Sequence, residues 1–253
     1  MERKIKGYGW NRDIPDGRDL MYAAPPAVVT ELPPKVDLRD QCPTVYDQGQ
    51  LGSCTANSIG GALEFDQIKQ KQQPFTPSRL FIYYNERVIE GTVSSDSGAQ
   101  IRDGVKSVNQ QGAPPETDWS YDISKFADKP PKQAYDNAKR HEAILYQRVT
   151  QTLPQLKGCL AAGYPFVFGF VVYESFESQE VASTGEAPMP KAGEKQLGGH
   201  AVLAVGYDED QQRFIIRNSW GPGWGMAGYF TLPYPYLVQE TLSSDFWTIR
   251  SVA

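Results

Sequence analysis

The sequence predicts an α+β protein in which helices come first and strands follow, packed as two lobes with a cleft between them. Residues 36–122 carry apolar side chains at helical spacing, whereas residues 123–253 carry short runs of β-branched and aromatic side chains. With 253 residues, of which 40% are hydrophobic and 12% aromatic, the chain can bury a substantial core. Residues 1–35 precede both lobes and form a separate segment.

The first half of the chain contains signals for helix starts and helix ends. A glycine-rich loop ends at Ser53 and Cys54, where an apolar helical period begins, so a helix is expected to start there. Thr76 and Pro77 suit a helix cap and a first helical position, and Gly112 suits a helix end. The predicted helices cover about residues 53–65, 77–88, 99–111, 131–142 and 154–162.

The second half contains short apolar runs that favour strands. They cover residues 166–172, 201–207, 214–217, 229–232 and 246–252. The longest run, residues 166–172, is far shorter than the roughly 20 residues that a membrane helix needs. A soluble protein without a membrane partner is therefore expected.

The N-terminal segment, residues 1–35, contains five prolines and shows no sustained helical or alternating pattern, so it is predicted to be extended. It lacks the apolar core and the small-residue cleavage pattern of a secretory signal. A cytoplasmic location is the default expectation, with export by another route left open.

Charge and cysteine content exclude several classes of function. The net charge is −5 and the charges are interleaved along the chain, so no nucleic-acid partner is expected. Three cysteines without a Cys-x-x-Cys pair are too few for a disulfide framework or a thiolate zinc site. Only two histidines are present, His141 and His200, so a histidine-rich metal cluster is also excluded and no cofactor is expected.

Three separate motifs carry candidate chemistry. Cys54 stands where the glycine-rich loop becomes a helix, and a helix N-terminus lowers the pKa of a thiol, which makes it a better nucleophile. His200 follows two glycines at the start of an apolar strand, where its ring could face the cleft. Asn218 follows another strand; its amide could hold the imidazole in one tautomer, with Trp220 shielding that bond. Singly, each residue could instead be ordinary packing or turn chemistry.

Taken together, these motifs resemble the papain-like cysteine peptidases. The resemblance is strongest at Val36-Asp-Leu-Arg39, Gln48–Ala56, Gly199-His-Ala-Val202 and from Asn218-Ser-Trp-Gly221 through Gly228-Tyr229. It is weaker in between and spans residues 36–253. His200 and Asn218 follow Cys54 by 146 and 164 residues, the first within the family's usual interval of about 130–150 residues and the second slightly beyond it.

The resemblance implies a papain-like two-lobe fold, with a helical lobe, an antiparallel β-barrel-like lobe and the active site between them. It implies an endopeptidase with Cys54 as nucleophile, His200 as base, Asn218 as orienter of the histidine and Gln48 as a side-chain donor of the oxyanion hole. Residues expected to line the substrate groove are Gly98, Gly199 and Trp220. The implied partners are a peptide or protein substrate, no cofactor is implied, and a monomer is expected.

Several positions depart from the secreted members of that family. Leu51 stands where a disulfide cysteine is usual, Thr55 replaces a bulky aromatic residue, and the usual double glycine of the groove is Gly98-Ala99. The segment 1–35 is much shorter than a helical pro-domain, and we interpret it as an inhibitory pro-segment of a zymogen; a packing arm without a regulatory role is the alternative. A Cys–His acyl transferase and a non-catalytic binding protein with this fold are the rival functions.

Overall fold

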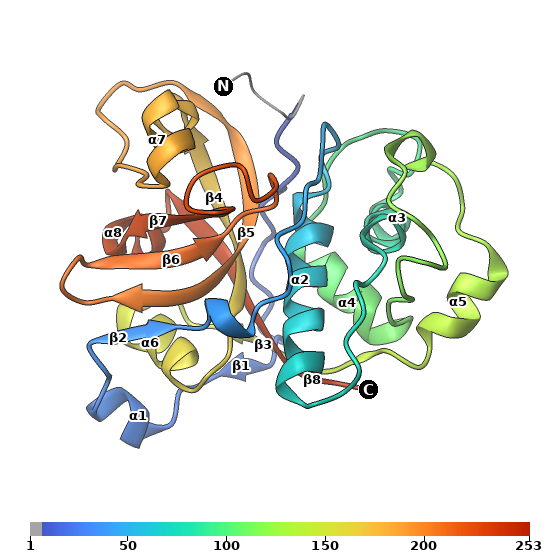
Figure 1. Cartoon of the computed structure of the whole chain (residues 1–253), viewed down its shortest axis with the longest axis horizontal. Coiled ribbons are helices and arrows are strands. Elements are labelled where there is room, and N and C mark those ends of the chain that lie inside the picture. The colour runs from blue at the N-terminus through green and yellow to red at the C-terminus, as the bar shows by residue number, and fades with distance from the viewer. Residues whose placement is uncertain (1–6) are drawn as a thin grey trace.

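A computed structural model of the chain describes residues 7–253 and has two halves, one helical and one built on a sheet (Figure 1). The first six residues of the predicted pro-segment lie outside the described residues. Helices α2 to α5 form one side of the view and the strands the other, and the N-terminal segment runs between them (Figure 1). None of the helices within residues 7–253 combines the length and the apolar character needed to cross a membrane.

Helix α2, Cys54–Lys69, begins at the predicted nucleophile and is buried on almost all sides, as expected for the central helix of a domain. Helix α3, Arg79–Glu90, begins later than predicted, because Ser78 caps it by accepting a hydrogen bond from the Phe81 N–H. The remaining longer helices are α4, Ile101–Gln110, α5, Lys132–Ala138, and α6, Leu153–Ala161.

Helix α5 packs against α3, although its residues follow the predicted boundary between the lobes. The rings of Phe81 and Tyr135 lie 4.7 Å apart, and the Tyr135 hydroxyl donates to Asn85 at 3.1 Å. The helical half therefore extends beyond residue 122, where the sequence had placed the start of the β-rich lobe.

The β-rich half is an eight-stranded sheet with the order β1-β3-β8-β4-β5-β6-β7, and β2 pairs with β5. All of its strand pairs are antiparallel except β1 with β3, which is parallel. The sequence analysis expected an antiparallel lobe and did not foresee this one parallel pair. The strands are β1 Met21–Tyr22, β2 Lys35–Asp37, β3 Ala143–Val149, β4 Phe166–Tyr173, β5 Gln196–Asp208, β6 Arg213–Arg217, β7 Tyr229–Pro233 and β8 Ser243–Val252. Shorter helical segments are Pro26–Thr30 (α1), Gln179–Thr184 (α7), Tyr234–Val238 (α8), Arg39–Gln41, Ile123–Lys125 and Glu174–Glu177.

Aromatic packing fixes the sheet, and a direct contact fixes α2 upon it. The rings of Phe168 on β4 and Phe246 on β8 stack in parallel with centroids 5.3 Å apart. On the helical side, the Ser58 hydroxyl donates to the Ala201 carbonyl of β5 at 2.9 Å. The start of α2 and the middle of β5 are thus held side by side, which decides where the functional side chains meet.

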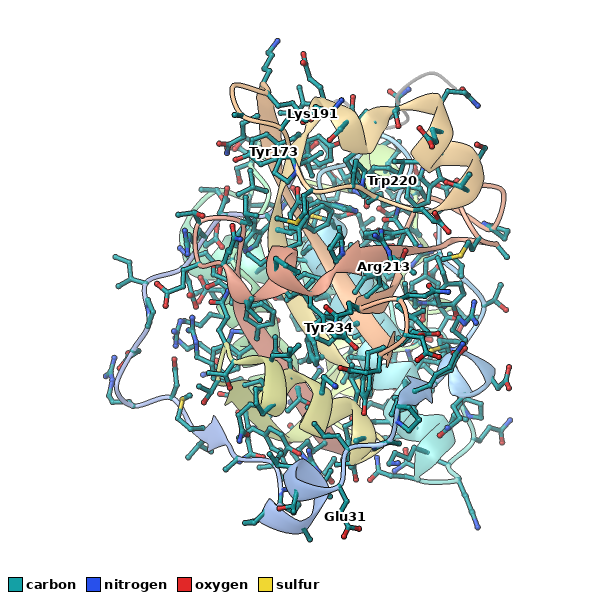
Figure 2. The ribbon with its side chains drawn as sticks, turned by 90° about the vertical axis from the view of Figure 1, so that its left-hand side faces the viewer. Glu31, Tyr173, Lys191, Arg213, Trp220 and Tyr234 are labelled. Atoms are coloured by element: carbon teal, nitrogen blue, oxygen red, sulfur yellow. The ribbon has the colours of Figure 1, made fainter. Side chains whose placement is uncertain are left out.

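The second half of the predicted pro-segment belongs to the β-rich half. Strand β1 pairs with β3, Tyr22 and Ala24 are buried, and the Tyr207 hydroxyl donates to the Pro33 carbonyl at 2.7 Å. Helix α1, which ends beside Glu31, lies at the opposite end of this half from Trp220 (Figure 2). Residues 21–35 are therefore folded structure, and the prediction of an extended segment describes only the residues before them.

We predict that Tyr22→Ala lowers the free energy of unfolding by about 3 kcal/mol, because the ring is buried and lies 4.6 Å from the guanidinium carbon of Arg250. Chemical denaturation measures this change. Leu20→Ala is the control, since Leu20 is 63% exposed, and it should change stability by less than about 0.5 kcal/mol. Equal stability of the two variants would show that residues 21–35 are not part of the folded core.

Candidate active site

Cys54 is the first residue of α2. Its side chain is completely buried, and the backbone N–H of Ala201 on β5 donates to its sulfur at 3.4 Å. This contact joins the helix N-terminus to the strand that carries His200. The two residues, far apart in sequence, are therefore neighbours as predicted.

His200 lies within β5 rather than at its start, because β5 begins at Gln196 and its glycines still pair with β4. Its Nε2 lies 2.9 Å from Oδ1 of Asn218, which follows β6. The Ser219 N–H also donates to this oxygen at 2.9 Å, which fixes it as an acceptor and so assigns the imidazole proton to Nε2. His200 Nδ1 is buried, has no hydrogen-bond partner among the described residues, and so is the basic nitrogen.

Aromatic rings enclose the His200–Asn218 bond. The Trp220 indole stacks on the imidazole with centroids 5.1 Å apart and an interplanar angle of 29°, and Phe170 meets the imidazole edge-on at 5.8 Å. Both rings keep water from the bond, so the imidazole is held in one orientation. Trp220 is therefore placed against the imidazole, and its predicted contact with substrate stays a prediction.

Gln48 joins the same cluster through Ser219, a residue that the sequence analysis did not single out. The Ser219 hydroxyl donates to Gln48 Oε1 at 2.6 Å, and Gln48 Nε2 donates to the Leu51 carbonyl at 2.9 Å. One proton of the amide nitrogen remains for another acceptor. The only sequence signal for Ser219 was its position directly after Asn218, which also suits a simple turn.

Behind the nucleophile lies a buried carboxyl group that the sequence analysis also missed. The Thr55 hydroxyl donates to Oε2 of Glu86 at 2.8 Å, and burial raises the pKa of Glu86 well above its ordinary value. Burial therefore favours the neutral form of this carboxyl group beside Cys54. The small Thr55 side chain, in place of a bulky aromatic one, makes this contact sterically feasible.

Residues 8–11, here called the strap, cross the cleft between the two halves. The strap bonds to the helical side through Gly9, whose carbonyl accepts from the Ala99 N–H at 2.8 Å, and through Asn11, whose N–H donates to the Ala99 carbonyl at 3.0 Å. It bonds to the β-rich side through Trp10, whose N–H donates to the Gly199 carbonyl at 2.9 Å. Two residues predicted to line the substrate groove, Gly98 and Gly199, therefore lie against the chain's own N-terminal segment.

Two close approaches show how tightly the strap fits. Gly98 has φ +70°, and a Cβ there would come within 2.2 Å of the Gly9 carbonyl oxygen, so glycine is required on both counts. The Tyr8 ring meets the His200 imidazole edge-on with centroids 5.7 Å apart. Cys54 and His200 both have 0% exposed surface as a result.

Burial reverses the expected ionisation of the two groups. It raises the pKa of Cys54 to about 12, although the N–H groups of Ala201 and Gly9 point at the sulfur and act in the opposite direction. It lowers the pKa of His200 to about 4, against the hydrogen bond to Asn218. The sequence analysis expected a lowered thiol pKa, because it considered the helix N-terminus without the strap above it.

Within residues 7–253, no group of three or more His, Cys, Asp or Glu side chains is placed to hold a metal ion.

We predict that alkylation of Cys54 in the full-length protein accelerates about tenfold per pH unit from about pH 6 to about pH 10, because only the thiolate reacts. Both groups are neutral in that interval, with the pKa of Cys54 raised to about 12 and that of His200 lowered to about 4. Mass spectrometry of the iodoacetamide-labelled peptide gives the rate. A plateau reached below about pH 7 would indicate a thiolate–imidazolium pair and contradict this assignment.

Comparison with known proteins matches most of the chain to one family. The model of the papain family of cysteine proteases matches residues 32–235. An uncharacterized peptidase C1-like protein of Acanthamoeba polyphaga mimivirus is 44% identical, over 98% of this chain and 88% of that protein.

Solved structures agree as well. The crystal structure of xylellain, a cysteine protease from Xylella fastidiosa, has a TM-score of 0.91 and 46% identity, over 100% of this chain and 99% of that chain. A cysteine protease of Carica candamarcensis has the same fold at a TM-score of 0.63, with 22% identity over 85% of this chain and 97% of that chain. The chain therefore belongs to the papain family of cysteine proteases.

Proposed function

We propose that this cysteine protease is an endopeptidase in which Cys54 is the nucleophile and His200 the base, with Asn218 holding the imidazole. The observation that carries the proposal is the 2.9 Å hydrogen bond between His200 Nε2 and Asn218 Oδ1. His200 lies on β5, and the N–H of the following residue, Ala201, donates to the Cys54 sulfur. The His200–Asn218 bond leaves Nδ1 as the nitrogen that can accept the thiol proton.

The reaction divides peptide hydrolysis into two acyl transfers. The Cys54 sulfur bonds to the scissile carbonyl carbon as its proton passes to His200, and the oxyanion accepts hydrogen bonds from Gln48 Nε2 and the Cys54 N–H. The imidazolium then returns the proton to the leaving amine as the C–N bond breaks, which leaves a thioester. Water, deprotonated by His200, hydrolyses the thioester and regenerates the thiol.

We further propose that the strap inhibits the enzyme in the full-length chain. Support comes from the complete burial of Cys54 and His200 and from the backbone bonds of the strap to both sides of the cleft. A substrate cannot reach the sulfur until the strap leaves. The inhibitory part is the strap and its attachment rather than all of residues 1–35, since residues 21–35 are folded into the β-rich half.

We predict that Gly9→Ala raises peptide hydrolysis by about tenfold, since an added Cβ would stand 1.8 Å from the Gly52 carbonyl oxygen and so force the strap away. The Gly52 N–H is held by the Asp96 carboxylate at 3.0 Å, so the strap is expected to move rather than the loop. Release of a fluorophore from peptides blocked at both ends measures the rate. Gly7→Ala is the matched control, because no atom lies within 4 Å of its added Cβ.

If both variants matched the wild type, the strap would not be inhibitory.

We predict that Cys54→Ala, placed in the Gly9→Ala background, reduces hydrolysis to the uncatalysed rate. Gln48→Ala in the same background should lower kcat about 100- to 1000-fold, because an oxyanion donor is lost. Steady-state kinetics with the blocked peptides provides the comparison. Retained turnover in Cys54→Ala would exclude Cys54 as the nucleophile, and an unchanged kcat in Gln48→Ala would remove Gln48 from the oxyanion hole.

A further inference from the structure

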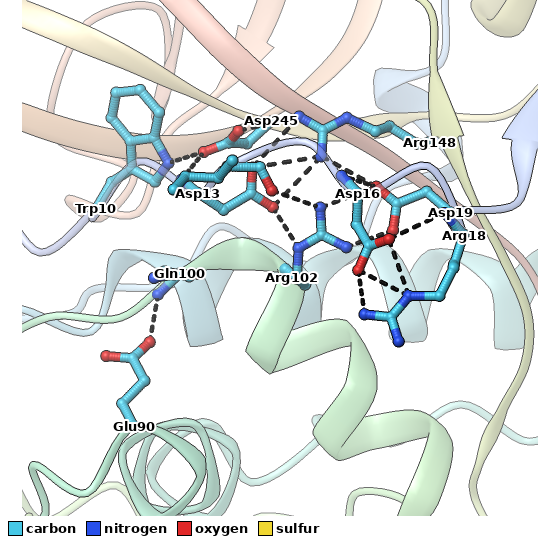
Figure 3. A network of polar contacts seen from close by, with 11 residues as sticks. Trp10, Asp13, Asp16, Arg18, Asp19, Glu90, Gln100, Arg102, Arg148 and Asp245 are labelled. Atoms are coloured by element: carbon cyan, nitrogen blue, oxygen red, sulfur yellow. Dashed lines mark hydrogen bonds and ion pairs between the residues drawn. The ribbon is translucent and has the colours of Figure 1, made fainter.

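Two arginines, the buried Arg102 and the largely shielded Arg148, bind carboxylates of the leader just after the strap, one from each half of the molecule (Figure 3). Arg102 on α4 donates to Asp13 at 2.8 Å and to both carboxylate oxygens of Asp19. Arg148 on β3 lies 3.3 Å from Asp13 and 3.3 Å from Asp19. Each arginine therefore contacts both carboxylates, and both carboxylates contact both halves.

The cluster is shielded from solvent, so its charges are not the weak pairs of an exposed surface. The side chains of Arg102 and Arg148 are 9% and 12% exposed, and those of Asp13 and Asp19 are 1% and 7% exposed. Both guanidinium groups lie over the indole of Trp247, with Cζ 5.3 Å and 5.5 Å from its centroid. The Trp247 ring therefore supports both guanidinium groups beside the carboxylates.

A third carboxyl group connects this cluster to the strap. Asp245 on β8 accepts hydrogen bonds from the Trp10 indole and from the Asp13 backbone N–H, both at 3.0 Å, and lies 3.3 Å from Arg148. The strap ends at residue 11, so only Arg12 separates it from Asp13. A leader fixed at Asp13 therefore keeps the strap over Cys54.

The charges are consistent with a site made for two carboxylates. Burial would raise the pKa of Asp13, but Asp245, Arg148 and Arg102 lower it below its ordinary value. Burial and the hydrogen bond to Asp13 together raise the pKa of Asp245 to about 7, so this third carboxyl binds a proton more readily than the other two. Two cations then face two anions. If the leader left, Arg102 would lose both of its carboxylate partners.

Resting on the inhibition proposed above, we propose that Arg102 and Arg148 form a carboxylate-binding site, distinct from the catalytic residues, which takes an acidic peptide segment. In the full-length chain its ligand is Asp13 and Asp19 of the leader, and this binding anchors the strap. A separate peptide with two carboxylates at the same spacing is the ligand when the leader is displaced. Because the site lies on both halves, its occupation also ties α4 to β3 beside the cleft.

The test replaces the leader carboxylates and leaves the arginines and the catalytic residues unchanged. In the full-length double variant Asp13→Asn with Asp19→Asn, peptide hydrolysis and alkylation of Cys54 should both rise about tenfold or more, since charge-assisted bonds are lost. Asp16→Asn is the matched control in the same loop. The Asp16 side chain bonds to the exposed Arg18, so this variant should behave as the wild type.

A second measurement adds a synthetic peptide of residues 8–19 to the double variant. The native peptide should restore inhibition and slow the alkylation of Cys54, whereas a peptide with Asn at both positions should bind at least about tenfold more weakly. If the double variant does not fold, as judged by circular dichroism, Asp19→Asn alone replaces it, because Asp13 still pairs with both arginines.

The outcomes separate the two proposals. Equal alkylation rates in the wild type, Asp16→Asn and the double variant would overturn the carboxylate-binding site, as would equal inhibition by the two peptides. Faster alkylation without any peptide hydrolysis would support the site as an anchor of the leader and would contradict the proposed endopeptidase function.

Discussion

The docking of helix α2 against strand β5 is the contact on which the rest of the structure depends. The Ser58–Ala201 and Ala201–Cys54 hydrogen bonds fix the position of the N-terminus of α2 along strand β5. Cys54 then has His200 as a neighbour without any flexible loop between them. Rigid placement of this kind is what a nucleophile and base need, because small displacements of reacting groups slow the reaction steeply.

Contacts made by the residues after β6 connect Cys54 and His200 to the rest of the site. Asn218 fixes the imidazole, Ser219 connects Asn218 to Gln48, and the Trp220 ring covers the group. Three consecutive residues after a single strand thus hold the side chains of His200 and Gln48. The local motif is short, but its function depends on the pairing of β6 with β5, which brings it beside the helix.

The leader uses the same two halves for a different purpose. Its strap covers Cys54 through backbone bonds and ring contacts, whereas its carboxylates bind two arginines farther from the sulfur. The neutral contacts of the strap at the active site and the charged contacts of the leader carboxylates involve different residues, so each set can be changed by mutation without changing the other. The site residues are therefore all in place while burial keeps the thiol and the imidazole uncharged.

Much of this could be predicted from the sequence, and the failures have identifiable physical causes. The α+β class and the helix start at Cys54 followed from local patterns, and the papain-like fold followed from the motifs around Cys54, His200 and Asn218. Strand β3 was missed because the polar residues Gln147 and Arg148 interrupt its short apolar run.

The leader shows where sequence patterns stop being informative. Its division into strap, carboxylate anchor and folded part depends on contacts with residues more than a hundred positions away, such as Gly199 and Arg148. The raised pKa of Cys54 has the same origin, since the strap removes the sulfur from water. Composition alone could not distinguish these three parts.

The most direct test of this account is a search for the acyl-enzyme by mass spectrometry. The Gly9→Ala variant is mixed with a peptide ester, quenched in acid and digested. The account predicts a thioester adduct of the substrate's acyl part on the peptide that contains Cys54, at a higher level than in the wild type. Ester hydrolysis without an adduct on Cys54, or with the adduct on Cys42 or Cys159, would contradict it.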